Sequence, residues 1–179
     1  PPFPGMGYPL VPGYESVGRI RELGSAVTGF AMGQRVFVPG ARCFGEVRGL
    51  FGGAASQLVV PAARVTAVDD ALGERAVLLA LAETAYHALA NPAATPADLI
   101  VGHGVLGRLL ARVALAMGSP APTVWERNAK RRDDAQGYLV IAPEDDARRD
   151  YRAIYDVSGD VHILDAAVAR LAPGGQIVL

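Results

Sequence analysis

Three glycines, at residues 102, 104 and 107, separate an apolar run from an amphipathic run, and this arrangement constrains the fold more than any other feature. The apolar run is Leu99–Val101. After the glycines, apolar residues recur at helical spacing, at Leu106, Leu109, Leu110, Val113, Ala114 and Met117. A strand that enters a helix through a G-x-G-x-x-G turn is typical of a unit that binds dinucleotides at a helix N-terminus.

Each residue of this turn has an expected role. Gly102 permits a tight turn, Gly104 lets the backbone approach a pyrophosphate, and Gly107 lets the helix pack closely on the strand. We therefore assign the whole turn to cofactor binding: Gly102, His103, Gly104, Val105, Leu106 and Gly107. The role of His103 stays open, because a residue at this position either touches phosphate or substrate or, more commonly, points to solvent.

An acidic residue completes the predicted unit. Glu126 follows a second apolar run, Thr123–Trp125, and lies 19 residues after Gly107. A carboxylate there accepts hydrogen bonds from the ribose hydroxyls and repels a 2′-phosphate, which favours NAD as the cofactor.

Basic residues follow Glu126 directly, at Arg127, Lys130, Arg131 and Arg132. They either attract a 2′-phosphate, as NADP would need, or form the solvated face of a helix over residues 127–135. We favour the helix face. We keep Arg127 and Arg131 among the cofactor-binding candidates.

The second half of the chain alternates strands with helices. Strands are expected at 99–101, 123–125, 138–142, 153–157 and 176–179, and helices at 72–90, 106–117, 127–135 and 160–171, with stops at Asn91-Pro92 and Pro173–Gly175. This alternation predicts an α/β fold with a doubly wound parallel sheet.

The first half follows a different pattern. Short alternating runs at residues 17–23, 35–39 and 56–60 are separated by turn signals, and residues 40–53 form a glycine-rich loop. This pattern predicts a small β-barrel. We place this β-domain at residues 1–82 and a dinucleotide-binding domain at residues 83–179, both partial. The chain starts without Met and stops inside an apolar run, so we interpret it as a fragment of a longer protein.

Composition narrows the function classes. With 17 basic and 18 acidic residues the formal net charge is −1, which gives no reason to expect nucleic acid as a partner. The apolar runs are too short for an integral membrane segment. The single cysteine, Cys43, excludes an internal disulfide and suits a cytoplasmic location.

Motifs along nearly the whole chain resemble the medium-chain dehydrogenase/reductase superfamily. They comprise Pro12–Ile20 (the family's G-H-E-x-x-G-x-V), Gly52–Pro61, Thr84–Leu89, Asp156–Gly159 and Pro173–Val178. The resemblance implies that residues 1–82 are a chaperonin-10-like substrate and catalytic domain and residues 83–179 a Rossmann domain, both truncated here, with a small-molecule substrate held between them. It also implies that Thr84, Val157 and Ser158 contact the cofactor.

Departures from the family pattern concern the metal. Tyr14 replaces the histidine that zinc-dependent members use as a ligand, and Ala80 stands where a third ligand would fall. We therefore expect a zinc-free enzyme with no metal site. Tyr14 is the first candidate for handling the proton, Glu15 supports the local network, and His87 is a lower-ranked proton relay. A buried, satisfied tyrosine and a boundary histidine are the ordinary alternatives for Tyr14 and His87.

A narrower resemblance concerns residues 2–15, which are similar to the bacteriochlorophyll-synthesis branch of that superfamily. It implies NAD-dependent oxidation of a secondary alcohol to a ketone, at the hydroxyethyl group of a chlorin pigment. The full-length protein is expected to be a homo-oligomer. Two alternatives stay open: a zinc-free quinone or enone reductase that uses NADPH, and a nucleotide-binding redox sensor without turnover.

Overall fold

The computed structural model describes residues 7–90 and 95–179, and the chain divides into two compact units, residues 1–80 and 81–179. The expected stop at Asn91-Pro92 and the first residues of the narrower resemblance lie outside the described residues. The expected domain boundary after residue 82 stays a prediction.

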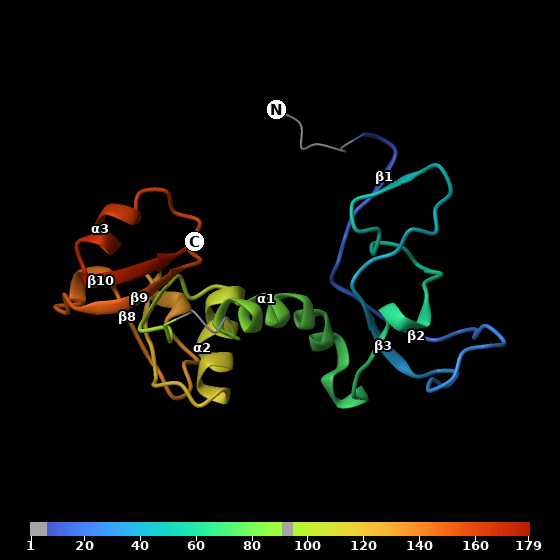
Figure 1. Cartoon of the computed structure of the whole chain (residues 1–179), viewed down its shortest axis with the longest axis horizontal. Helices are drawn as coiled ribbons and strands as arrows, with labels where there is room; N and C mark the ends of the chain where they lie inside the picture. The colour runs from blue at the N-terminus through green and yellow to red at the C-terminus, as the bar shows by residue number, and fades with distance from the viewer. Residues whose placement is uncertain (1–6, 91–94) are drawn as a thin grey trace. The chain divides into compact units, whose positions relative to one another are not determined.

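The second unit is built on one parallel sheet of five strands (Figure 1). The strands are β6 (Leu99–Val101), β7 (Thr123–Trp125), β8 (Leu139–Ile141), β9 (Tyr151–Asp156) and β10 (Leu171–Val178). Their order across the sheet is β10-β9-β6-β7-β8, and every neighbouring pair is parallel. Central strand β6 is buried along its length, as expected for a strand covered on both faces. The predicted doubly wound sheet is confirmed.

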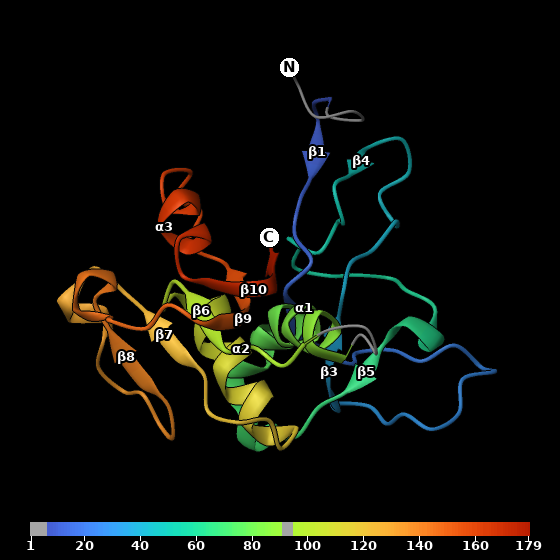
Figure 2. The same ribbon diagram turned by 60° about the vertical axis from the view of Figure 1, so that its left-hand side comes forward.

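Helices cover both faces of this sheet, because alternate residues of each strand point to opposite sides. Ile100 and Val124 pack with Leu110 of α2 (Val105–Ala116) and Ala85 of α1 (Leu79–Ala90). On the opposite face, Leu99, Val101 and Trp125 pack with Ile163 and Ala167, next to and within α3 (Leu164–Val168). Figure 2 shows α2 and α3 on either side of the strands.

The first unit contains short strands, as the turn-rich pattern predicts. An antiparallel sheet has the order β2-β3-β5, formed by β2 (Ser16–Arg19), β3 (Arg35–Val38) and β5 (Thr66–Ala67). A second pair joins β1 (Leu10–Val11) in parallel to β4 (Arg48–Gly49), inside the expected loop at residues 40–53. The short helix η1 (Ala62–Arg64) precedes β5.

The expected strand at residues 56–60 does not form. Val59 is 80% exposed, and its amide contacts the Cys43 sulfur at 3.5 Å rather than a strand carbonyl. A strand needs a hydrogen-bonded neighbour, and no neighbouring strand pairs with this segment within the described residues.

Two predicted helices of the second unit are much shorter than expected. The basic segment forms only the single turn η3 (Ala129–Arg131), because Asn128 caps it and Asp134 adopts a left-handed φ of 62°. The helix expected at 160–171 is reduced to α3. Leu171 already belongs to β10, and the expected stop at Pro173–Gly175 is an irregularity inside that strand.

The helix expected at residues 72–90 begins earlier and is interrupted. It consists of η2 (Asp70–Leu78) followed by α1. Gly73 has φ 56° and ψ −136°, which breaks the helical path. A further turn, η4 (Pro143–Asp145), links β8 to β9.

The glycines of the loop after β6 offer a test of the fold. A Cβ at Gly107 would overlap the carbonyl oxygen of Gly102, whereas a Cβ at Gly104 would meet nothing within 4 Å. We expect Gly107→Ala to lower the free energy of unfolding by about 1–3 kcal/mol in urea titrations. The matched control, Gly104→Ala, should lower it by less than about 0.5 kcal/mol. Equal losses would contradict the close helix–strand contact.

Candidate functional site

The carboxyl ends of β6, β7 and β9 meet at one edge of the parallel sheet. Gly102, Glu126 and Val157 follow these strands directly. From β6, strands β7 and β8 are added in one direction across the sheet, whereas β9 and β10 lie in the opposite direction from β6. The strand order therefore reverses beside β6. Ligands of open α/β sheets bind at such a reversal.

The glycine-rich loop presents backbone rather than side chains. Gly102 has φ 102°, and a Cβ there would lie 2.9 Å from the Cα of Ser158. Gly104 is the N-cap of α2 and supplies no side-chain cap. The first intrahelical bond of this turn is donated by the Arg108 amide to the Gly104 carbonyl, so the amides before it are available to an anion.

Glu126 connects this loop to the segment after β7. Its side chain is 9% exposed. One carboxylate oxygen accepts the His103 amide at 3.2 Å, and the other accepts the Asn128 amide at 2.8 Å. Each carboxylate oxygen can accept a further hydrogen bond. Glu126 can therefore both order the loop and accept ribose hydroxyls.

The expectation that His103 points to solvent is wrong. Its imidazole is 1% exposed, with Nδ1 2.5 Å from the Arg131 carbonyl oxygen and Nε2 2.8 Å from the Tyr138 hydroxyl. The chain after β7 folds back over the loop and supplies both partners. Burial lowers the pKa of His103 below its usual value, and the positive charges of Arg108 and Arg112 act in the same direction.

The basic residues beside Glu126 are not on a helix over residues 127–135, but Arg127, Lys130 and Arg131 are exposed, as the solvated-face interpretation expected. The Arg127 guanidinium pairs with Asp160 at 2.8 Å. Arg132 donates to the carbonyl oxygens of Glu126 and Arg127, at 2.7 and 3.0 Å. The Arg131 carbonyl oxygen accepts a hydrogen bond from the Arg108 guanidinium, at 2.9 Å, and is also the partner of the His103 ring. The Arg132 guanidinium therefore orders the segment itself, and the Arg127 guanidinium ties it to Asp160.

Sequence reasoning missed two residues of this network, Arg108 and Tyr138. Arg108 lies on α2 and donates to the carbonyls of His103 and Arg131. Tyr138 was expected only as the start of a strand. Neither has a local signal, since their partners lie 5 to 35 residues away along the chain.

A small cavity lies next to the loop, with a volume of about 130 Å³. Thr84, Leu106, Val157 and Val178 are among its lining residues. Beside it, Asp156 accepts the amide of Ser158 at 2.9 Å and its hydroxyl at 2.7 Å, which fixes the turn after β9. The predicted contacts Thr84, Val157 and Ser158 thus gather near the glycine-rich loop.

A buried carboxylate supports strand β7 just before Glu126. Asp146 accepts the Trp125 indole N–H at 2.7 Å, the Tyr151 hydroxyl at 2.6 Å and the Arg148 amide at 2.8 Å. Burial would raise the pKa of Asp146, but these hydrogen bonds and the nearby Arg170 hold it below its usual value.

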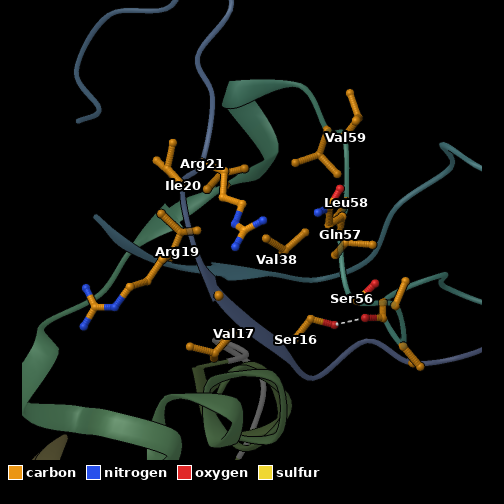
Figure 3. Close-up of a pocket in the computed structure, with 18 of the residues that line it drawn as sticks. Ser16, Val17, Arg19, Ile20, Arg21, Val38, Ser56, Gln57, Leu58 and Val59 are labelled. Atoms are coloured by element: carbon orange, nitrogen blue, oxygen red, sulfur yellow. Dashed lines mark hydrogen bonds between the residues drawn. The ribbon is translucent and has the colours of Figure 1, made fainter. Parts of the chain in front are cut away.

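The first unit carries two of the catalytic candidates along a broad hollow of about 1640 Å³. Tyr14 and Glu15 border it; Tyr14 is 40% exposed, with its ring edge-on to Phe51 at 5.0 Å between centroids. Figure 3 shows Ser16, Val38 and Val59 around this hollow, with Ser16 bonded to the Gly53 carbonyl at 2.9 Å. The third candidate, His87, is exposed on α1.

Residues 7–90 and 95–179 offer neither a cluster of metal ligands nor a membrane-spanning helix. No group of three or more histidine, cysteine, aspartate or glutamate side chains is placed to hold a metal ion among these residues. None of their helices is both long and apolar enough to cross a membrane.

Comparison with known proteins identifies related sequences and folds. Residues 2–70 match the alcohol dehydrogenase GroES-like domain family. Two proteins described as 2-desacetyl-2-hydroxyethyl bacteriochlorophyllide A dehydrogenase, from Cereibacter sphaeroides and Rhodobacter capsulatus, are each 58% identical across all of this chain. The matches cover 58% and 57% of those proteins, so the chain spans less than two thirds of their length.

A solved structure shares the fold at lower identity. It is an Escherichia coli CFT073 protein described as a short chain alcohol dehydrogenase, in complex with NADH, with a TM-score of 0.73 and 21% identity. The match covers 96% of this chain and 61% of that one.

Asp146 offers a test of how the site is supported. We expect Asp146→Asn to lower the free energy of unfolding by about 2–3 kcal/mol at neutral pH, since the amide NH₂ would face a donor. A carboxylate with a lowered pKa stabilises the fold above its usual value of 3.8, and this contribution is lost as pH falls through the folded pKa. The difference from wild type, followed by Trp125 fluorescence in urea, should therefore shrink below pH 3.8.

The matched control for Asp146 is Asp133→Asn, at an exposed position of the same unit. It should change the unfolding free energy by less than about 0.5 kcal/mol. A pH-independent difference for Asp146→Asn would contradict the role of its charge.

Proposed function

Because this chain belongs to the medium-chain dehydrogenase/reductase superfamily, we propose that the intact protein is an NAD-dependent alcohol dehydrogenase. Its substrate is the hydroxyethyl group of a bacteriochlorophyllide, which it oxidises to an acetyl group. The observation that carries this proposal is the 58% identity, over the whole chain, to two proteins described as acting on that pigment.

The reaction moves two hydrogens from the alcohol. The carbinol carbon gives a hydride to the nicotinamide ring, and the hydroxyl gives a proton to a base, so that ketone, NADH and a proton are formed. NAD, when bound, supplies the hydride acceptor. The protein's own part is to bind the coenzyme, orient the alcohol and receive the proton.

The backbone at the start of α2 fits a diphosphate. The space beside Gly104 is open, and the amides of Val105, Leu106 and Gly107 precede the first intrahelical bond. These amides would hold the diphosphate, with the positive end of the helix dipole behind them. The glycine-rich loop as a whole is thus proposed as the phosphate site.

Glu126 favours NAD over NADP in this arrangement. Its carboxylate would accept the adenosine ribose hydroxyls and repel a 2′-phosphate. Arg127 and Arg132 are engaged with Asp160 and with backbone carbonyls, which makes them less available to a phosphate. We propose that Arg127 and Arg131 flank the adenosine, and that Thr84, Val157 and Ser158 contact the nicotinamide side.

Proton handling is assigned to residues of the family motif. Tyr14 would orient the alcohol or take part in proton transfer, Glu15 would support it, and His87 would relay the proton. Zinc-dependent catalysis needs imidazole, thiolate or carboxylate ligands, and neither Tyr14 nor Ala80 supplies one. We propose that hydrogen bonding, rather than a metal, assists hydride transfer.

Coenzyme binding tests the proposed site. In calorimetric titrations of the intact protein, NAD should bind at least about tenfold more tightly than NADP. Gly104→Ala should weaken NAD binding about tenfold or more while the protein stays folded, because its Cβ would stand in the phosphate path. A strong preference for NADPH would point to the reductase alternative. NAD binding without oxidation of the pigment alcohol would point to the redox sensor.

Turnover tests the catalytic assignment. With the hydroxyethyl pigment and NAD, we expect Tyr14→Phe to reduce kcat by about 10²-fold or more, as loss of a proton-transfer group does. The control, Tyr86→Phe, removes a hydroxyl from an exposed tyrosine of α1 and should leave kcat unchanged. Equal rates for Tyr14→Phe and wild type would exclude Tyr14 from the chemistry.

A further inference from the structure

We propose that His103 is a positioning residue that links the glycine-rich loop to the turn after Glu126 and thereby sets the affinity for the adenosine half of the coenzyme. This inference rests on the proposed function, because it assigns a role to a side chain inside the proposed coenzyme site. It differs from both alternatives that the sequence left open, a contact with phosphate or substrate and a side chain that points to solvent, because the imidazole faces the protein interior.

The hydrogen bonds of His103 determine its tautomer. The Arg131 carbonyl can only accept, so Nδ1 carries the hydrogen and donates to it. In the neutral ring Nε2 is then an acceptor, which receives the Tyr138 hydroxyl. Both ring nitrogens are thereby satisfied at a position that is 1% exposed. The side chain is therefore bound to two segments that follow β7 in the chain.

A second link joins the glycine-rich loop to the chain after β7 through the backbone of His103. Its amide donates to Glu126 at 3.2 Å, and its carbonyl accepts from Arg108 at 3.3 Å. Arg108 also donates to the Arg131 carbonyl, at 2.9 Å. One residue of the loop thus fixes the spacing between the helix N-terminus and the carboxylate proposed for the ribose.

The spacing matters because the diphosphate is covalently joined to the adenosine ribose through its 5′-methylene group, which limits how far apart the two binding sites can lie. The amides at the start of α2 and the Glu126 carboxylate must both be in place for this half of the coenzyme to bind. Preorganised contacts bind more tightly than contacts that must be ordered at the time of binding. Loss of the His103 links should therefore weaken coenzyme binding without changing the chemical step.

The test measures steady-state kinetics of the intact protein with NAD and the hydroxyethyl pigment. His103→Phe keeps the ring but loses both hydrogen bonds, so we expect KM for NAD to rise about tenfold or more with kcat within twofold. Inhibition by 5′-AMP, which carries only the adenosine side, should weaken by the same factor. His103→Asn, which retains a donor for the Arg131 carbonyl, should recover part of the affinity.

Tyr138→Phe provides a milder variant in case His103→Phe fails to fold. It removes only the donor to Nε2, and it should raise KM for NAD with kcat unchanged. The matched control is Tyr151→Phe, which removes another buried tyrosine hydroxyl, bonded to Asp146 rather than to the loop. It should lower the unfolding free energy and leave KM for NAD unchanged.

A spectroscopic measurement tests the tautomer independently. In ¹⁵N-labelled protein at neutral pH, His103 should show a protonated Nδ1 and an unprotonated Nε2. An Nε2–H tautomer would overturn the proposal, as would unchanged KM values in both His103→Phe and Tyr138→Phe. If wild type binds neither NAD nor 5′-AMP, the proposed function itself fails. If wild type binds NAD and both variants bind it equally well, only the role of His103 fails.

Discussion

The close contact between helix α2 and strand β6 is the constraint on which the site depends. Gly107 lies against the Gly102 carbonyl, and Gly102 lies against the backbone of Ser158, so no side chain fits at either point. This contact brings the N-terminus of α2 to the edge where the carboxyl ends of β6 and β9 meet. The helix amides, the turn after β9 and Glu126 then surround one place, as nucleotide sites of doubly wound sheets require.

Around this contact the protein uses its own charges to order the site. Glu126 accepts hydrogen bonds from the backbone amides of His103 and Asn128. Asp146 accepts one from the indole N–H of Trp125, at the end of the same strand. Arg108 and Arg132 donate to backbone carbonyls of the segment after β7. Hydrogen bonds between charged groups and backbone are stronger than neutral ones, which explains how a segment with one helical turn keeps a defined path.

The sequence predicts those features of the fold that depend on local pattern. Strand β6, helix α2 and the three glycines were located correctly because hydrophobic period and turn chemistry act over a few residues. The role of His103 stayed open because its partners, Arg131 and Tyr138, lie 28 and 35 residues further along the chain. The helix expected at 127–135 does not form, for a related reason. Asn128 and Asp134 favour turns, and Arg108, which is distant in the sequence, donates to the Arg131 carbonyl and stabilises the single turn η3. The catalytic assignments remain predictions, since they depend on family motifs.

The strand order also affects how the protein is made. Central strand β6 pairs with β7 on one side and with β9 on the other, and β9 begins only at Tyr151. During synthesis, one edge of the fully apolar Leu99–Val101 segment therefore stays unpaired until about fifty further residues have left the ribosome. Parallel pairing over such a separation is slow, and an open apolar edge invites association between chains. The nascent protein is accordingly exposed to such association over this interval.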